Sequence, residues 1–278
     1  MDHFTNKNPI SKPILQLNKT DFGGAFPLSP AVFDEDVDLP RITLYLRLWN
    51  GGFGEFDESD IVRITYDLNR KMTVEMERIT KGQDPRAFHN AKGEQCLLFN
   101  NGGTMAMYLP QKKELSFFPK GQEWEKNWAP IEGSDLFFLS SHTTTLRLQP
   151  LFLQGPPLSV EIGKVRGGTP FVQTSKDVWM AFGHSAERNE KQMTYQAVPI
   201  QFKGSPFNPL QQGTPLEARW FFEYQSLRNG ELPYNWKSIV FPTAFFRHRD
   251  KYFIGAHLDD KESILAAIDL YKLNYCQE

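Results

Sequence analysis

Cysteine is scarce in this sequence: only Cys96 and Cys276 occur among 278 residues, and they lie far apart. No group of cysteines and histidines has the spacing of a zinc site, so we expect no metal. The first twelve residues lack the apolar stretch of a signal peptide. Without a secretory signal, free thiols in a cytoplasmic protein are the simplest expectation.

Long apolar runs and an excess of one charge are also lacking. No stretch approaches the roughly eighteen apolar residues that span a membrane. The 31 Lys and Arg residues nearly balance 33 Asp and Glu residues, for a formal net charge of −2. Nucleic-acid binding usually needs a strongly basic face, whereas the basic residues here are scattered. We therefore expect neither nucleic acid nor a membrane as a partner.

Two motifs of common catalytic sites are absent as well. The sequence contains no glycine-rich phosphate loop ahead of a helix and no Gly-x-Ser-x-Gly nucleophile elbow. Its one glycine-rich stretch, 51–54, follows a strand-like run and leads into FDESD, which indicates a turn. We expect no bound cofactor.

What the sequence does contain is a long series of short strand-like runs bounded by Gly, Pro, Asn and Asp. Clear examples are 41–49, 61–67, 95–99, 104–109, 178–182 and 252–256. Helical periodicity is weak, and its best candidates, 263–270 and 72–79, can equally be read as strands. Many short strands with turn signals between them predict an all-β sandwich, barrel or propeller.

An internal repeat distinguishes between these architectures. A proline, apolar residues, a polar turn and a strongly apolar strand recur five times, starting at Pro30, Pro85, Pro130, Pro170 and Pro242. The spacing suits one four-stranded blade per copy. The fourth interval is longer because it contains a surface excursion at about 202–235, a candidate lid. We predict a single five-bladed β-propeller domain over residues 1–278, and a sandwich remains the alternative.

The innermost strands of a propeller start near one end of the central channel, so polar residues at the repeat starts should converge there. The residues nominated by this rule are Arg47, Asn50, Asp84, Arg86, Lys126, Asn127, Arg166, His184, Asp259, Asp260 and Glu262, with Trp49, Trp128 and Tyr252 nearby. Carboxylates beside aromatic rings suit a sugar. Clustered Arg, Lys and His suit a phosphate or a carboxylate. We expect a carbohydrate partner, with phosphate as a possible co-substrate.

Each nominated residue also has a purely structural explanation. Asp84 could cap a turn, and Arg86 could pair with Asp84 or with a neighbouring blade. His184 could be a hydrogen-bonded histidine at a strand end and Lys126 a solvated loop residue. Asp259 and Asp260 could be ordinary turn residues. Convergence of all five repeat starts on one axis favours the functional alternative, because unrelated turns would not share a direction.

Four segments of the repeats carry a family resemblance: KGQDPRAF, WEKNWAPI, RGGTPFVQTSKDVWMAFGHS and IVFPTAFFRHRDKYFIGAHLDDKES. They resemble the five-bladed propellers of the glycosidase type, and most closely glycoside hydrolase family 130, the β-mannoside phosphorylases and hydrolases. The first segment resembles the family's GxEDPR motif, the second its Lys-Asn or Lys-Asp motif, the third its Gly-Gly-x-Pro segment that ends in a histidine, and the fourth its closing segment. The similarity extends, with gaps, from about Pro30 to Leu273.

The resemblance implies a pocket that binds a mannose-like ring. In such phosphorylases an aspartate acts as general acid on the glycosidic oxygen while phosphate attacks the anomeric carbon with inversion. Asp84 matches this aspartate. Arg47, Lys126 and His184 match positions that hold phosphate, and Arg86 and Asp260 would bind the sugar or serve the structure.

This sequence departs from the family pattern at three places. Gln83 stands where the family has glutamate, Thr243-Ala244 replaces a glycine, and His257-Leu258 alters the closing turn. An acid catalyst also needs its pKa raised toward the working pH. The cations near Asp84 would lower its pKa unless bound phosphate engages them, which favours phosphorolysis over hydrolysis.

Several alternatives stay open. Inverting hydrolysis would need a second carboxylate as base, from Asp259, Asp260 or Glu262. A non-catalytic glycan-binding propeller is consistent with Gln83 and the altered closing turn. The segment SSHTTTLRLQPL fits a branch whose members are often found with glycosyltransferases. A propeller used for protein contacts would present the aromatic segment 220–236.

Overall fold

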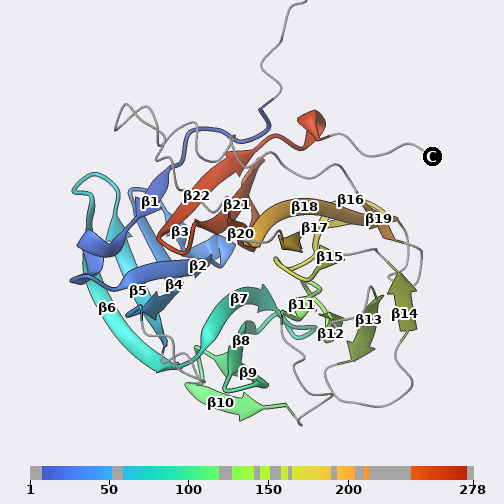
Figure 1. Cartoon of the computed structure of the whole chain (residues 1–278), viewed down its shortest axis with the longest axis horizontal. Helices are drawn as coiled ribbons and strands as arrows, with labels where there is room; N and C mark the ends of the chain where they lie inside the picture. Colours follow the sequence, from blue (N-terminus) through green and yellow to red (C-terminus); the bar gives the residue numbers. More distant parts are fainter. Residues whose placement is uncertain are drawn as a thin grey trace, which may run out of the picture.

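The computed structural model describes residues 8–51, 59–118, 127–140, 145–150, 158–161, 165–188, 193–203, 210–212 and 239–273. Within these residues the strands form five sheets of four or five strands each. The sheets are arranged around one centre (Figure 1). The predicted all-β propeller class is confirmed. No helix in the described part of the chain is long and apolar enough to cross a membrane.

Within each sheet, neighbouring strands run antiparallel, and sheets 1 to 3 follow one another along the chain. Sheet 1, from the centre outward, consists of β2 (Phe26–Ala31), β4 (Arg41–Trp49), β5 (Asp60–Asp67) and β6 (Met72–Lys81), with β3 (Val37–Asp38) beside β4. Sheet 2 consists of β7 (Gln83–His89), β8 (Gln95–Asn101), β9 (Thr104–Leu109) and β10 (Glu114–Phe117). Sheet 3 consists of β11 (Ala129–Pro130), β12 (Leu136–Ser140), β13 (Thr145–Pro150) and β14 (Leu158–Glu161).

The last two sheets complete the ring. Sheet 4 consists of β15 (Val165–Arg166), β17 (Val178–Arg188), β18 (Met193–Lys203) and β19 (Leu210–Gln212), with β16 (Val172–Ser175) beside β17. Sheet 5 consists of β20 (Val240–His248), β21 (Lys251–Leu258), β22 (Glu262–Ile268) and β1 (Leu15–Leu17). Short 3-10 helices occur at η1 (Lys19–Phe22), η2 (Asp34–Asp36) and η3 (Leu270–Lys272).

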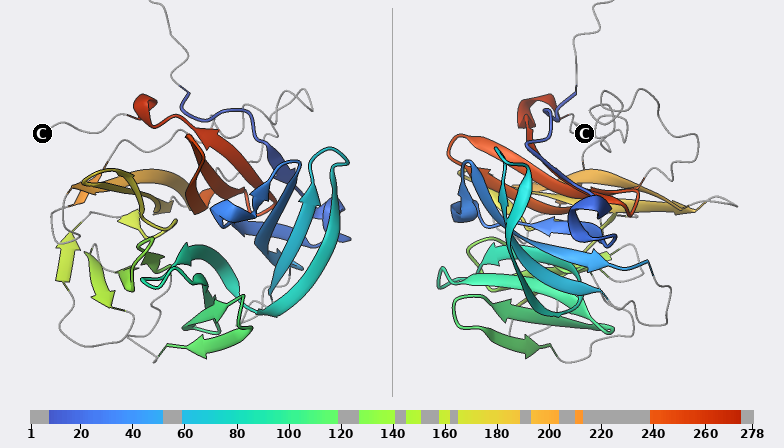
Figure 2. Two further views of the ribbon diagram at one scale, coloured as in Figure 1. Left: turned by 180° about the vertical axis from the view of Figure 1, so that it is seen from behind. Right: turned by 90° about the vertical axis from the view of Figure 1, so that its left-hand side faces the viewer.

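Sheet 5 joins the two ends of the described chain. Its outer strand β1 pairs with β22, with Leu15 opposite Leu265. Figure 2 shows the ring from behind and from the side, with blue β1 lying against red β22. Both ambiguous segments of the sequence are strands, because β6 covers 72–81 and β22 covers 262–268.

The repeat prolines lie on or beside the innermost strands, but not always at a strand start. Pro30 lies near the end of β2, whereas Pro85 lies near the start of β7. The pairing register shifts between Leu28 and Ala31 and again between Gln83 and Arg86, which indicates bulges. A bulge leaves a residue outside the hydrogen-bond ladder, so a proline there costs no ladder bond.

The hydrophobic core is divided among the spaces between adjacent sheets. Along β8, Leu97 packs with residues of sheet 1 and Leu98 packs with residues of sheet 3. Both faces of the strand are therefore buried, as they must be in a ring where every sheet has two neighbours. Buried apolar clusters likewise fill the spaces between sheets 3 and 4, between sheets 4 and 5, and between sheets 5 and 1. Cys96 lies in this core with a free thiol, and Cys276 lies outside the described residues.

Two glycines allow the sheets to approach closely near the axis. A Cβ added at Gly167 would overlap the carbonyl oxygen of Asn127 in the segment before β11. A Cβ at Gly168 would overlap the carbonyl oxygen of Phe182 and press on that of Pro242 in sheet 5. The Gly-Gly pair therefore lets sheets 3, 4 and 5 meet where the inner strands begin.

Candidate functional site

The inner strands of sheets 1 and 2 each contain a turn of the same kind. Ser29 and Asp84 each precede a repeat proline, and each has a φ of 52°. The Ser29 hydroxyl donates to Oδ1 of Asp84 at 2.8 Å, and Arg47 Nη1 reaches the same oxygen at 3.2 Å. Positive φ is uncommon for residues other than glycine and often marks a functional turn. Here it turns both side chains toward each other.

Sheet 5 adds an imidazole and a second carboxylate to this group. His257 Nδ1 lies 3.0 Å from the Ser29 hydroxyl, and its Nε2 lies 3.2 Å from Oδ1 of Asp260. Ser29 and His257 are 0% and 4% exposed, whereas the Asp260 side chain is 44% exposed. We call this group, made of Ser29, Arg47, Asp84, His257 and Asp260, the Asp84 mouth of the axis.

The electrostatics of the Asp84 mouth favour an ionised Asp84. Burial opposes the charge, but Arg47, His257 and Arg86 outweigh burial and hold the pKa of Asp84 well below its usual range. Burial also opposes the charge of Asp260, and the hydrogen bond and charge of His257 lower the pKa of Asp260. Both carboxylates are therefore anions at neutral pH in the ligand-free protein.

Arg86 connects three sheets beneath the mouth. Its guanidinium donates to the carbonyl oxygens of Gly168 and Asp84 and to Oδ1 of Asn127, which lies at 3.2 Å. Burial lowers the pKa of Arg86 to about 10, so it remains a cation at 1% exposure. Each guanidinium nitrogen has a protein partner, which supports the structural alternative for Arg86. Asn127 shares this role as its acceptor.

His184 is buried near the axis in a neutral state. Its Nδ1–H donates to the carbonyl oxygen of Gly167 at 2.9 Å. Burial, with the charges of Arg86 and Arg166, lowers the pKa of His184 to about 3. Arg166 pairs directly with His184 in the ladder of sheet 4. A neutral ring that donates through Nδ1 has only an acceptor at Nε2, which suits a sugar hydroxyl better than the phosphate oxygen implied by the resemblance.

The remaining nominated residues differ in their placement. Asp259 exchanges hydrogen bonds with Ile239, since its Oδ1 accepts the Ile239 N–H at 2.9 Å and its own N–H donates to the Ile239 carbonyl. This contact fixes the turn after β21. Lys126 lies outside the described residues, as does nearly all of the 202–235 excursion.

Of the three aromatic residues expected near the axis, Tyr252 is placed elsewhere. It lies near the start of β21, where its hydroxyl donates to the Thr174 carbonyl and its ring stacks on Phe245. The expectation for Tyr252 is therefore wrong, because the repeat starts meet the end of β21 and not its beginning. Phe241 is the ring that lies at the Asp84 mouth, with its centroid 4.9 Å from that of His257 and 4.4 Å from that of His184.

At the opposite ends of the inner strands lies a second charged group. His89 Nδ1 is 2.6 Å from a Glu132 oxygen, and its Nε2 is 2.8 Å from Glu35. Asp34, Glu35 and His89 each offer one ligand atom within 4.8 Å of one another, the spacing a metal ion would need. A cavity of about 380 Å³ opens beside them, lined from all five sheets. We call Asp34, Glu35, His89 and Glu132 the His89 mouth.

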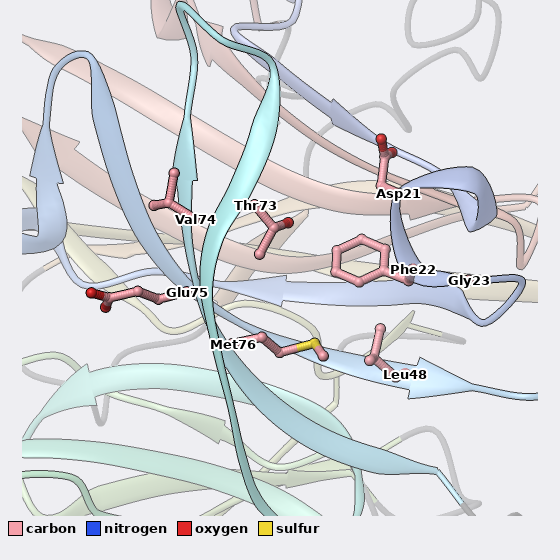
Figure 3. Close-up of a pocket in the computed structure, with 8 residues that line it drawn as sticks. All are labelled: Asp21, Phe22, Gly23, Leu48, Thr73, Val74, Glu75 and Met76. Carbon is pink, nitrogen blue, oxygen red and sulfur yellow. The ribbon is translucent and has the colours of Figure 1, made fainter.

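A further cavity, of about 400 Å³, lies on the outer side of sheet 1 between η1 and β6 (Figure 3). Its charged lining residues are Asp21 and Glu75, and apolar side chains such as Phe22, Leu48 and Met76 line the rest. This lining contains no cation or imidazole. In this respect the cavity differs from the Asp84 mouth, where carboxylates contact Arg47 and His257.

Sequence reasoning nominated Asp84 and Arg47 but missed Ser29 and His257 as partners of Asp84. A signal was available for Ser29, because it stands before Pro30 just as Asp84 stands before Pro85. His257 gave no such signal, since it lies 228 residues from Ser29 and pairs with it only through closure of the ring.

Comparison with known proteins supports this fold through structure and not through sequence. No family model matches the chain, and no curated protein matches it. Among solved structures, β-1,2-mannobiose phosphorylase from Listeria innocua is 12% identical, with 96% of each chain covered and a TM-score of 0.62. This chain has its fold. A glycosyl hydrolase from Bacteroides ovatus is 13% identical, with 98% of this chain and 94% of that chain covered and a TM-score of 0.59.

A third solved structure widens the range of reactions. It is a GDP-Man-dependent mannosyltransferase from Leishmania mexicana, 12% identical, with 89% of this chain and 86% of that chain covered and a TM-score of 0.56. A phosphorylase, a hydrolase and a transferase thus share one architecture. At such identities the likeness shows the fold alone, and the reaction has to be argued from the site.

Proposed function

We propose that this protein acts on a glycosidic bond of a mannoside-like glycan at the Asp84 mouth, by inverting phosphorolysis, with Asp84 as general acid. The observation that carries the proposal is the position of Asp84. It is a carboxylate at the axis, 15% exposed and held by Arg47 and Ser29, on a fold shared with enzymes named for mannosides. Sugar hydroxyls would find hydrogen-bond partners in Asp260 and the acceptor nitrogen of His184.

The electrostatics favour phosphorolysis over hydrolysis. Without an anion, Arg47 stabilises the ionised form of Asp84, and an ionised carboxylate cannot donate a proton. A phosphate ion bound near Arg47 would offset that positive charge and raise the pKa of Asp84 toward the working pH. The co-substrate would then both attack the sugar and prepare the acid.

The test is an assay of phosphate release and uptake with a panel of β-mannosides and mannose 1-phosphate. Asp84→Asn should lower kcat by roughly 10²–10⁴-fold, the usual contribution of a general acid. Asp34→Asn, an equivalent change at the His89 mouth, is the matched control and should keep full turnover. Phosphate-dependent turnover that survives in Asp84→Asn would remove Asp84 from the reaction.

A non-catalytic glycan-binding propeller is the second candidate, and one contact favours it. Gln83 stands next to Asp84 where the family has a carboxylate, and its Oε1 accepts from Asn100 Nδ2 at 3.3 Å. This neutral amide pair would leave Asp84 without the like charge that raises a carboxyl pKa. For a binder, calorimetry with mannosides would show affinity that is unchanged in Asp84→Asn, and folded protein would release no product.

A further inference from the structure

Asp84 is one end of a continuous chain of polar side chains contributed by three sheets. Asp260 contacts His257 Nε2 at 3.2 Å, His257 Nδ1 contacts Ser29 Oγ at 3.0 Å, and Ser29 Oγ contacts Asp84 at 2.8 Å. All three distances suit hydrogen bonds. The order is therefore carboxylate, imidazole, hydroxyl, carboxylate.

The first three members have the order of a hydrolase triad, but Ser29 is not placed to act as a nucleophile. It is 0% exposed, and its single hydroxyl hydrogen is directed at Asp84 and not at a substrate. In a nucleophilic triad the serine hydrogen goes to the histidine. Here the hydroxyl instead connects the imidazole to a second carboxylate.

The number of available hydrogens determines which protonation states allow all three of these hydrogen bonds to form. An ionised Asp84 only accepts, so the single Ser29 hydrogen goes to it, and Ser29 must then accept from His257 Nδ1. Asp260 is also an acceptor, so His257 Nε2 must donate to it. All three contacts together therefore need a hydrogen on both ring nitrogens. If Asp84 instead carries the proton, His257 needs a hydrogen only on Nε2, because Ser29 then donates to Nδ1.

The surrounding structure holds these four side chains in place. The His257 ring stacks on Phe241 with an interplanar angle of 15°, which fixes its plane. Ser29 lies in a bulge of β2 with a φ of 52°, so its side chain points to Asp84 and His257 and not along the ladder. A fixed geometry is what a proton transfer between neighbouring groups needs.

We propose that His257 stores a proton that Ser29 passes to Asp84, with Asp260 orienting the imidazole. In this step the Nδ1–H bond of the imidazolium breaks and an O–H bond forms at Ser29, while the original Ser29 O–H bond breaks and one forms at Asp84. The imidazolium and the carboxylate become neutral imidazole and carboxylic acid, so the total charge of the four side chains does not change. The step supplies the acid of the proposed function, and only its catalytic use rests on that function. Ser29 and His257 are positioning residues, because they act through Asp84. Asp260 orients His257 in addition to its proposed contact with the sugar.

The charged groups around this chain decide where the proton rests. Arg47 and Arg86 face Asp84 and favour its ionised form. With Asp84 ionised, the three contacts together need a hydrogen on both ring nitrogens of His257, so the transferable proton is assigned to that ring. An anion bound at Arg47 would reduce the stabilisation that Arg47 gives to the Asp84 carboxylate. The proton would then move to Asp84.

The test measures the protonation of the His257 ring by ¹⁵N NMR and needs no substrate. Replacing Asp84 by Asn should lower the affinity of the ring for its second proton by roughly tenfold, since a nearby opposite charge is lost. The Ser29→Ala variant should reduce this effect of Asp84→Asn by about half or more, because only the through-space part remains. An equal effect with and without the Ser29 hydroxyl would overturn the relay.

A matched serine provides the control. Ser263 pairs with His257 across β22 and β21 and is 1% exposed, but its hydroxyl donates to the Pro27 carbonyl at 3.0 Å. Ser263→Ala should leave the full coupling between Asp84 and His257. If Asp84→Asn unfolds the protein, Asp260→Asn tests the other end of the chain, since its side chain is 44% exposed and replaceable. That variant should also lower the proton affinity of the ring.

The relay and the proposed function can fail separately. NMR coupling with no turnover on the mannoside panel would keep the relay and reject the mannoside reaction. Turnover with no NMR coupling would do the reverse. Where turnover occurs, Ser29→Ala should lower kcat by about tenfold at unchanged KM, because Asp84 then takes its proton from water.

Discussion

The two mouths of the axis use similar side chains in different arrangements. At the Asp84 mouth carboxylates face cations and an imidazole, which hold the pKa of Asp84 well below its usual range. At the His89 mouth Asp34 lies beside Glu35, and burial with the hydrogen bond and charge of Glu35 raises the pKa of Asp34 to about 6. The two ends of the inner strands therefore shift the pKa of an aspartate in opposite directions.

Packing differs between the mouths as well. Near the Asp84 mouth, Arg86 and the pair Gly167-Gly168 bring several sheets into direct backbone contact. At the His89 mouth, Gly133 has no atom within 4 Å of an added Cβ, and a cavity of about 380 Å³ opens beside His89. The closely packed end suits precise positioning of reacting groups.

Removing Arg86 should produce the largest effect on stability. Arg86→Met leaves the carbonyl of Gly168 and the side chain of Asn127 without their buried donor, and we expect a loss of about 3–5 kcal/mol of unfolding free energy. Arg247→Met, an exposed arginine beside the His89 mouth, should change stability by less than about 0.5 kcal/mol. Urea unfolding of both variants gives the comparison. Equal losses would mean that the two mouths do not differ in packing.

Enlarging a glycine should have a somewhat smaller effect. Gly168→Ala forces the new methyl group against the Phe182 carbonyl, and overpacking of this kind costs about 1–3 kcal/mol. Gly133→Ala meets no neighbouring atom, and its cost of about 1 kcal/mol comes only from the φ of 71°. Thermal unfolding should rank them in that order. A reversed order would contradict the close approach of sheets 3, 4 and 5.

The smallest effect is a pH-dependent one at the His89 mouth. Hydrogen bonding to Glu132 and Glu35 raises the pKa of His89 from 6.5 to about 9, so the folded protein binds this proton more tightly than the unfolded chain. The stabilisation should be complete below pH 6.5, decline as the pH rises and be lost above about pH 9. His89→Gln should therefore cost on the order of 1 kcal/mol at pH 6 and almost nothing at pH 10.

Urea midpoints of wild type and His89→Gln at the two pH values measure this difference. His248→Gln is the control, because the His248 ring contacts the carbonyl of Asp34 and, among the residues that the structure describes, no carboxylate. A cost for His89→Gln that is the same at pH 6 and pH 10 would show that Glu35 and Glu132 do not hold the imidazolium.

The fold could be predicted from the sequence because each repeat is contained in a short stretch of residues. Each repeat carries its proline, turn and apolar strand within a short window, and the run 41–49 corresponds to β4 residue for residue. The convergence of Asp84 and Arg47 also followed, since both flank repeat starts. The contact between His257 and Ser29 could not be predicted, because an imidazole and a hydroxyl 228 residues apart have no shared sequence pattern.

The roles of Arg86 and Asp259 could not be derived from sequence either. A guanidinium that binds substrate and one that binds backbone carbonyls are the same residue in a sequence, and only the three contacts of Arg86 distinguish them. Likewise, the carboxylate of Asp259 accepts from the backbone N–H of Ile239, the residue immediately before β20. Such assignments depend on distances set by the closed ring.

The pairing of β1 with β22 has a consequence for how the protein is made. Gln16 is synthesised long before Glu262. In the folded protein the side-chain amide of Gln16 donates to a carboxylate oxygen of Glu262 at 2.7 Å. Leu15 and Leu17 pack with residues of sheets 1 and 5, so their burial is complete only after four other sheets have been synthesised. During translation this early strand is an unpaired edge that a chaperone could protect. A circularly permuted gene that begins at β20 would deliver all four strands of sheet 5 together and remove that wait.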